Sequence, residues 1–195
     1  MARGRLISFE GIDGSGKTTI STRVYRAVKN LEVPVTYTYE PTHSKVGSIV
    51  HLVLNGDLKA SGAFQALMFA ADRVNHFETE ISPSLKSGVN VLVDRYVHSS
   101  IAYQGAVLKD ENWVRAINKS VPAPDLAIYI DIDPRISLRR RRRRSVFEKL
   151  HLLDEVRAIY KRMVASGELV EVDGSGTEGE VFEKAWELVS GHLGL

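Results

Sequence analysis

Cysteine is absent from this sequence of 195 residues. Without a thiol, the protein has no disulfide bond, no thiolate metal site and no cysteine nucleophile. An excess of charge of one sign is also missing, because 26 Lys and Arg residues stand against 24 Asp and Glu residues. The formal net charge of +2 gives no general basis for binding nucleic acid or an anionic membrane, so neither partner is expected.

Long apolar runs are missing as well. No apolar stretch approaches the roughly 20 residues of a membrane-spanning helix. The first residues, Met1-Ala2-Arg3-Gly4-Arg5, lead into a predicted strand without an apolar signal segment. The sequence therefore predicts a cytoplasmic protein. Because no repeat or Pro-, Gly- or Ser-rich linker divides the chain, we expect a single domain over residues 1–195.

Short apolar runs alternate with helical patterns along the chain. Five of these runs are typical of strands, at residues 6–9, 35–39, 89–93, 126–132 and 169–172. The uninterrupted apolar stretches within the third and fourth runs are typical of parallel strands buried on both faces. The alternation predicts an α/β fold with a five-stranded parallel sheet and helices on both faces. Ligands of such sheets bind beyond the carboxyl ends of the strands.

The first predicted strand is followed by Gly11-Ile12-Asp13-Gly14-Ser15-Gly16-Lys17-Thr18, which matches the phosphate-binding pattern G-x-x-x-x-G-K-[ST] at every fixed position. A helix is predicted directly after it, over residues 18–31. The backbone N–H groups of such a loop surround a polyphosphate, while Lys17 neutralises phosphate charge and Thr18 ligates Mg²⁺. A chance glycine-rich turn is the alternative, but the strand-turn-helix context argues against it.

Polar residues also follow the later strands. Asp94 and Arg95 end the third strand, where an acid and an arginine suit Mg²⁺ and phosphate. A salt bridge between them is the alternative, although neighbouring strand residues point to opposite faces. Glu40 follows the second strand and either faces the site or begins a solvated turn. Asp133, before a proline, is expected to cap the next helix.

A helix predicted over residues 63–85 places Phe69 and Arg73 on one face. The pair suits stacking on a planar base and hydrogen bonding to it, or an aromatic ring that covers an arginine stem. The six histidines share no metal-ligand spacing, so surface or packing positions are expected for them.

Six consecutive arginines occupy residues 139–144. They suit either contact with nucleic acid or a cationic lid over phosphates. A helix over residues 134–144 would spread them around its circumference, so they do not all address one ligand. Because the run lies between two predicted helices and the net charge is balanced, we favour a lid at about residues 139–148, which would exclude water during transfer.

The sequence resembles the thymidylate kinases, a family of P-loop nucleoside monophosphate kinases, over nearly its whole length. Four stretches carry the resemblance. They are Phe9-Glu10 with the loop through Thr19, then Glu40-Pro41-Thr42, then Phe69-Ala70-Ala71-Asp72-Arg73, and finally Asp94-Arg95-Tyr96 with Ser99, Ala102, Tyr103 and Gln104.

This resemblance implies transfer of the γ-phosphoryl group of ATP to dTMP, with Mg²⁺ as cofactor, by a homodimer. The implied catalytic residues are Lys17, Asp94, Arg95, Arg140 and Arg144, and the implied metal ligands are Thr18 and Asp94. ATP would be bound by Gly11, Ile12, Asp13, Gly14, Ser15, Gly16, Lys17, Thr18 and Thr19. The acceptor would be bound by Asp13, Glu40, Pro41, Phe69, Arg73, Arg95, Ser99, Tyr103 and Gln104.

The sequence departs from the family pattern at Tyr39, where many relatives have an arginine. Gly14 and Ser15 occupy variable positions of the phosphate loop, so the lid is expected to supply the catalytic arginine. The nearest alternatives are a broader pyrimidine monophosphate kinase and a deoxynucleoside kinase, which differ in acceptor selectivity. A GTP-binding switch is disfavoured, because the stretch at residues 118–121 lacks the acid that reads guanine.

Overall fold

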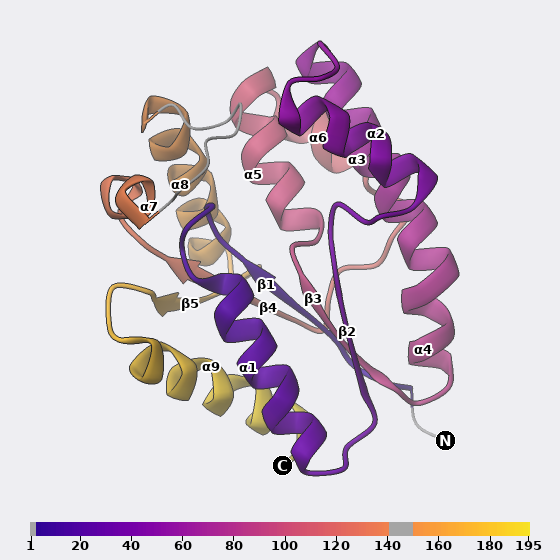
Figure 1. The fold of residues 1–195 in the computed structure, drawn as a ribbon, viewed down its shortest axis with the longest axis vertical. Helices are drawn as coiled ribbons and strands as arrows, with labels where there is room; N and C mark the ends of the chain where they lie inside the picture. The colour runs from indigo at the N-terminus through magenta and orange to yellow at the C-terminus, as the bar shows by residue number, and fades with distance from the viewer. Residues whose placement is uncertain (1–2, 141–149) are drawn as a thin grey trace.

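A computed structural model describes residues 3–140 and 150–195 (Figure 1). Its strands are β1 (Leu6–Glu10), β2 (Val35–Tyr39), β3 (Asn90–Asp94), β4 (Leu126–Asp131) and β5 (Val170–Asp173). They form one sheet in the order β2-β3-β1-β4-β5, and each pairing between these described strands is parallel. The predicted five-stranded parallel sheet is confirmed, with strand ends within one residue of the predicted ones.

Helices cover both faces of the sheet (Figure 1). They are α1 (Lys17–Asn30), α2 (Lys45–Asn55), α3 (Gly62–His76), α4 (Ser82–Lys86), α5 (Val97–Leu108), α6 (Glu111–Ile117), α7 (Pro134–Arg140), α8 (Leu150–Ala165) and α9 (Glu178–Leu193). Among the described residues, none of these helices is long and apolar enough to span a bilayer.

The two faces of β1 show why both sides of the sheet are buried. Ile7 and Phe9 pack with residues of α1 and α9. Leu6 points to the other face and packs near α4, while α5, α6 and α8 form a further cluster of buried residues. Because successive strand side chains alternate between faces, a strand covered on both sides must be apolar almost throughout.

The predicted helix over residues 63–85 is helical throughout, but it is not one regular α-helix. A π turn at Phe77–Ile81 separates α3 from α4. Pro83 follows this turn and has no N–H to continue the hydrogen-bond ladder, which accounts for the local change of helical type. The π turn begins directly after His76, a buried residue that contacts Glu40.

The caps of two helices are well defined, and that of α7 was predicted from the sequence. The carboxylate of Asp133 accepts a hydrogen bond from Arg135 N at 2.7 Å, as expected for the residue before α7. Thr177 caps α9 and forms a reciprocal capping box with Glu180.

Candidate active site

The phosphate loop lies between the carboxyl end of β1 and the first residue of α1. Two of its glycines are required by the backbone. Gly11 has φ +146° and a Cβ there would lie 2.7 Å from Ile130 O, while Gly16 has φ +91°. Only glycine adopts these conformations without strain. The loop therefore keeps its N–H groups at the edge of the sheet where β3 and β4 also end.

Lys17 is buried at this edge of the sheet, with only 6% of its surface exposed to solvent. Its Nζ lies 3.7 Å from Asp13 Oδ1. Burial and the nearby charge of Arg95 lower the pKa of Lys17, while the carboxylates of Asp13, Asp94 and Glu10 act in the opposite direction. A phosphate group beside Lys17 would add negative charge and favour the ammonium form.

Thr18 and Asp94 meet where α1 begins and β3 ends. The Thr18 hydroxyl donates a hydrogen bond to Asp94 Oδ2. Asp94 Oδ1 is buried and has no hydrogen-bond partner among the described residues. A carboxylate oxygen and a hydroxyl are the hard ligands that Mg²⁺ takes, so these residues fit that ion. Since the described residues include no group of three or more acidic or histidine side chains placed to hold a metal, water and phosphate oxygens would complete the shell.

Arg95 has an unusual backbone, with φ +69° in the left-handed region. Its Nη1 donates to Gly11 O at 2.9 Å and to Ser99 Oγ at 3.1 Å, and its Nη2 donates to Asp13. Asp94 bonds Thr18 instead. The salt bridge between Asp94 and Arg95 that the sequence left open is therefore not formed among the described residues.

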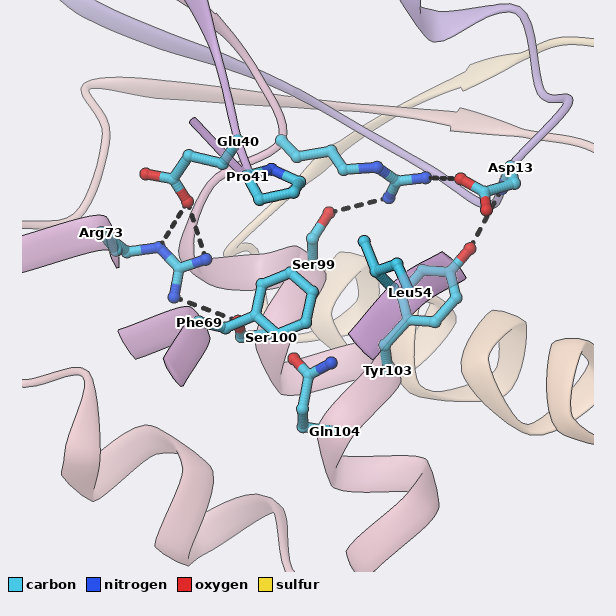
Figure 2. Close-up of a pocket in the computed structure, with 11 residues that line it drawn as sticks. Asp13, Glu40, Pro41, Leu54, Phe69, Arg73, Ser99, Ser100, Tyr103 and Gln104 are labelled. Atoms are coloured by element: carbon cyan, nitrogen blue, oxygen red, sulfur yellow. Dashed lines mark hydrogen bonds and ion pairs between the residues drawn. The ribbon is translucent and has the colours of Figure 1, made fainter. Parts of the chain in front are cut away.

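A pocket opens beside the loop and contains every residue predicted to bind the acceptor (Figure 2). Figure 2 shows Asp13 and Arg73 on opposite sides of it. Leu54 and Ser100 also line the pocket, although the sequence analysis did not select them. The side chains come from the loop, from the ends of β2 and β3, and from α2, α3 and α5. Residues that follow the strands therefore lie beside helices that cover the carboxyl end of the sheet.

Arg73 lies at the buried end of this pocket, with 2% of its surface exposed. Its Nε and Nη2 each lie 2.8 Å from Glu40 Oε2. The guanidinium also donates to Ser100 Oγ at 3.0 Å, to Asn118 Oδ1 and to Tyr96 O at 3.2 Å. The guanidinium of Arg73 thus donates four hydrogen bonds to protein acceptors and is ion-paired with Glu40. Of the sequence-based alternatives for Glu40, the solvated turn is wrong, because Glu40 is 5% exposed.

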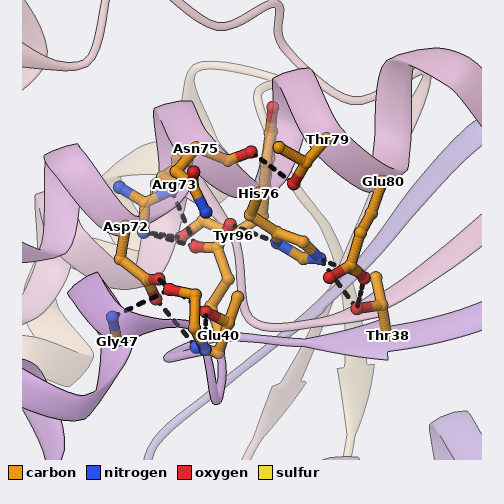
Figure 3. A network of polar contacts seen from close by, with 12 residues as sticks. Thr38, Glu40, Gly47, Asp72, Arg73, Asn75, His76, Thr79, Glu80 and Tyr96 are labelled. Carbon is orange, nitrogen blue, oxygen red and sulfur yellow. Dashed lines mark hydrogen bonds and ion pairs between the residues drawn. The ribbon is translucent and has the colours of Figure 1, made fainter.

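The network continues from Glu40 to a histidine (Figure 3). His76 Nδ1 lies 3.1 Å from Glu40 Oε1, and its Nε2 lies 2.7 Å from Thr38 Oγ1. His76 is buried, which agrees with the packing position expected for it. Its polar contacts could not be expected from the sequence, because the carboxylate that His76 contacts is 36 residues away.

Gln104 carries an unused acceptor in the same pocket. The residue is 3% exposed, and its Oε1 is buried without a hydrogen-bond partner among the described residues. Leaving a carbonyl oxygen unpaired costs about 1–3 kcal/mol. A ligand with an N–H group at this point would remove that cost.

A second cleft lies on the other side of the loop. It is lined by Ser15, Gly16 and Thr19 of the loop and α1, and by Gly174 and Gly176 after β5. Residues of the loop thus line two clefts, and they are the residues predicted to bind phosphate. This arrangement suits the transfer of a phosphoryl group between two bound nucleotides.

Comparisons with known proteins support the same conclusion. The family model described as thymidylate kinase matches residues 9–185. The chain belongs to the thymidylate kinase family. A probable thymidylate kinase of Staphylothermus marinus is 38% identical over 194 residues, which cover 97% of this chain and 96% of that protein. The thymidylate kinase of Leptospira interrogans is 32% identical over 188 residues, covering 93% and 92% of the two chains.

A solved structure of the thymidylate kinase from Candida albicans has the same fold, with a TM-score of 0.87 and 24% identity. The match covers 99% of this chain and 94% of that one. It confirms the P-loop nucleoside monophosphate kinase fold. Membership of the thymidylate kinase family makes the chain a kinase.

The predicted lid at about residues 139–148 is mostly outside the described residues. Residues 141–148, with Arg144, are not described, and neither is the side chain of Arg140. α7 leads toward this region, and its Ser137 donates a hydrogen bond to Asp13 O in the phosphate loop. The base of the predicted lid is thus attached to the loop that it would cover.

Several residues of the kinase site were not selected from the sequence. Ser100 precedes Gln104 by one helical turn of α5, so the helical period alone would have placed both on one face. Asn118, His76 and Glu10 have no such local signal. Their polar atoms are placed by partners that the fold brings from distant segments.

Proposed function

We propose that this kinase transfers the γ-phosphoryl group of ATP to the 5′-phosphate of dTMP, with Mg²⁺, to form dTDP and ADP. The pocket beside the phosphate loop carries the proposal, because it combines an aromatic ring, an unpaired buried acceptor and Arg95. Asp13 belongs to this pocket and also to the loop, so an acceptor held here would lie next to a donor phosphate.

The base end of the pocket suits thymine. Phe69 offers a ring for stacking, and Gln104 Oε1 is an acceptor without a protein donor in the described part of the chain. Thymine presents an N3–H donor, whereas cytosine presents an acceptor at the same ring position. The Gln104 oxygen therefore favours thymine or uracil over cytosine.

The phosphate end of the pocket suits the acceptor phosphate. Arg95 is fixed by Gly11 O and Ser99 Oγ, and its third contact is the carboxylate of Asp13. We infer that the acceptor phosphate exchanges with Asp13 at Arg95 and that the freed carboxylate bonds the 3′-hydroxyl of the deoxyribose. Charge-assisted bonds from a guanidinium to a phosphate are among the strong hydrogen bonds of proteins.

The chemistry then needs position and charge rather than a covalent intermediate. The loop N–H groups and Lys17 hold the donor phosphates, and Arg95 holds the acceptor in line with them. Thr18 and Asp94 would hold Mg²⁺, which when bound neutralises charge that develops on the phosphate oxygens. Since the second pKa of a phosphate monoester is about 6, the attacking oxygen is ionised at neutral pH and no strong general base is needed.

The second cleft is proposed as the donor site, with the loop after β5 beside the adenine. It adjoins the phosphate loop through Ser15 and Gly16. The lid arginines would approach from the end of α7, and Ser137 keeps that end attached to the loop.

We also propose a homodimer. Exposed apolar side chains lie on α2, α3 and α5, at Leu52 (46% exposed), Leu67 (45%) and Val107 (40%). Apolar surface of this kind is typical of an interface between chains. Light scattering after gel filtration should give twice the chain mass of 21.7 kDa. A mass of one chain would exclude the dimer.

The function is tested by ADP formation from ATP and Mg²⁺ with dTMP, dUMP, CMP, AMP or thymidine as separate acceptors. We expect the highest kcat/KM with dTMP, a lower one with dUMP and no turnover with thymidine. Turnover with thymidine would indicate a nucleoside kinase, and equal turnover with CMP would indicate a broader pyrimidine monophosphate kinase.

A further inference from the structure

A carboxylate that the proposed mechanism does not use lies directly behind Arg95. Glu10 is the last residue of β1 and precedes the phosphate loop, and its side chain is wholly buried at 0% exposure. Burial alone would raise its pKa, but the neighbouring His98, Ser99 and Arg95 lower the pKa below the ordinary value. Glu10 is therefore a buried negative charge next to Arg95.

The hydrogen-bond partners of Glu10 are Tyr96, which precedes α5, and Ser99 in its first turn. Oε1 accepts a hydrogen bond from Tyr96 N at 3.0 Å, and Oε2 accepts one from Ser99 Oγ at 2.6 Å. His98 Nδ1 lies 3.7 Å from Oε1, too far for a hydrogen bond but within ion-pair range. A carboxylate at a helix N-terminus is also stabilised by the helix dipole. Glu10 thus joins the end of β1 to the helix that follows Arg95.

The bond to Ser99 fixes the direction of a hydroxyl. Ser99 has a single hydrogen, which the short contact to Glu10 uses. Its oxygen is then left to accept hydrogen bonds, from Arg95 Nη1 at 3.1 Å and from the Tyr160 hydroxyl at 3.1 Å. Without the carboxylate the hydroxyl would be free to turn its hydrogen elsewhere, including toward the guanidinium.

The bond to Tyr96 fixes the backbone. Arg95 has φ +69°, a conformation that costs an ordinary residue about 1 kcal/mol or more. Arg95 N donates to Phe9 O at 2.9 Å and Tyr96 N donates to Glu10 Oε1 at 3.0 Å, so both peptide groups around Arg95 are bonded to the end of β1. Glu10 therefore holds the strained backbone as well as one contact of the side chain.

We propose that Glu10 is a positioning residue for the acceptor phosphate, because it orients Arg95 through the Ser99 hydroxyl and the Tyr96 N–H. This inference rests on the proposed function, in which Arg95 binds that phosphate. Glu10 itself contacts neither nucleotide in this proposal.

The test is the substitution Glu10→Gln, which preserves size but leaves one oxygen to serve two donors. We expect the KM for dTMP to rise about tenfold, the effect of one charge-assisted hydrogen bond, while the KM for ATP stays within twofold. A purely structural role would disturb the adjoining phosphate loop and raise the KM for ATP equally, which would overturn the proposal.

Ser8→Ala is the matched control. Ser8 points to the same face of β1, is also 0% exposed, and its Oγ has no partner among the described residues. Both KM values should be unchanged in this variant.

In the double variant Glu10→Gln/Ser99→Ala, the KM for dTMP should rise no more than in the more affected single variant. A product of the two single effects would show that Glu10 acts independently of Ser99.

A measurement without nucleotide separates this inference from the proposed function. The side-chain N–H signal of Arg95 in the ¹⁵N spectrum, assigned with Arg95→Lys, should shift in Glu10→Gln and not in Ser8→Ala. An unshifted signal overturns the positioning role even if dTMP is the substrate.

If Glu10→Gln does not fold, Glu10→Asp retains the charge but withdraws it from Ser99, and should show the same shift. A Glu10→Asp signal like that of the wild type would overturn the inference.

Discussion

The guanidinium of Arg95 and the carboxylate of Asp13 form an ion pair that connects the end of β3 to the phosphate loop. Both residues also line the acceptor pocket. If the acceptor phosphate binds Arg95 as proposed, it would replace Asp13 there. Binding of the acceptor would then be coupled to the conformation of the loop, since Asp13 would have to move.

The first prediction concerns the buried cation of the loop. Replacing Lys17 with Ala should lower kcat by a few orders of magnitude, because it removes a charge that stabilises the transferring phosphoryl group. The measurement is steady-state ADP formation with saturating dTMP, with circular dichroism as the check on folding. Turnover close to that of the wild type would contradict the assignment.

The second prediction concerns metal dependence. Chelation of Mg²⁺ with EDTA should abolish turnover, and Asp94→Asn should raise the Mg²⁺ concentration for half-maximal rate about tenfold or more, since an amide is a weaker ligand than a carboxylate. A titration of rate against Mg²⁺ at fixed ATP gives the value. The same half-maximal concentration in variant and wild type would exclude Asp94 as a ligand.

The third prediction concerns the unpaired acceptor of the pocket. Gln104→Leu should lower kcat/KM for dTMP about tenfold or more, because the N3–H of the base loses its acceptor. The rate with CMP, which has no N3–H, should change less, so the ratio of the two specificities is the quantity to measure. An equal loss for both acceptors would mean that the substitution disturbs the shape of the pocket and that Gln104 does not select the base.

The sheet and the phosphate loop could be predicted because their signals are local. Parallel strands buried on both faces are continuous apolar runs, and the loop has a fixed spacing. α5 lacks such a signal. Nine of its residues are buried, so no polar face alternates with an apolar one, and the sequence analysis placed no helix there.

Glu40 and Arg95 were selected because they follow strands, Phe69 and Arg73 because they share a helix face, and Ser99, Tyr103 and Gln104 through the family resemblance. All of them line one pocket, but their contacts could not be predicted. Glu10 bonds Ser99, which lies 89 residues later, and Arg73 bonds Asn118, which lies 45 residues later. Such pairs depend on how β1, β3 and the helices above them meet. The sequence therefore indicated which side chains face the site and left open which of them hold one another.

The fourth prediction concerns Arg73. Arg73→Ala should raise the KM for dTMP and leave the KM for ATP unchanged, as its place in the acceptor pocket implies. It should also lower the free energy of unfolding by about 3–5 kcal/mol, because the buried carboxylate of Glu40 loses the guanidinium and keeps only its contact with His76. Urea denaturation measures the second effect. Arg115→Ala, which removes an exposed pair with Glu168, is the control and should have little effect.

The last prediction concerns Asp131, which ends β4 and holds α8. Its carboxylate accepts two hydrogen bonds from Arg157, each 2.8 Å, and one from the Tyr129 hydroxyl at 2.7 Å, and Lys161 lies 2.9 Å away. Burial would raise the pKa of Asp131, but Arg157, Tyr129 and Lys161 lower it well below its ordinary value. We expect Asp131→Asn to reduce the free energy of unfolding by about 1–3 kcal/mol at pH 7.

The pH dependence of that difference follows from the direction of the shift. A carboxylate whose pKa is depressed in the folded state stabilises the fold above its unfolded pKa, about 3.9, and this contribution is lost as the pH falls toward the folded pKa. The gap between wild type and Asp131→Asn in urea denaturation should therefore be constant from pH 7 to about pH 5 and shrink below about pH 4. Glu155→Gln, at the exposed pair with Lys109, should show no measurable gap at pH 7. A gap for Asp131→Asn that is independent of pH would mean that side-chain shape, rather than the charge on Asp131, stabilises the junction of β4 and α8.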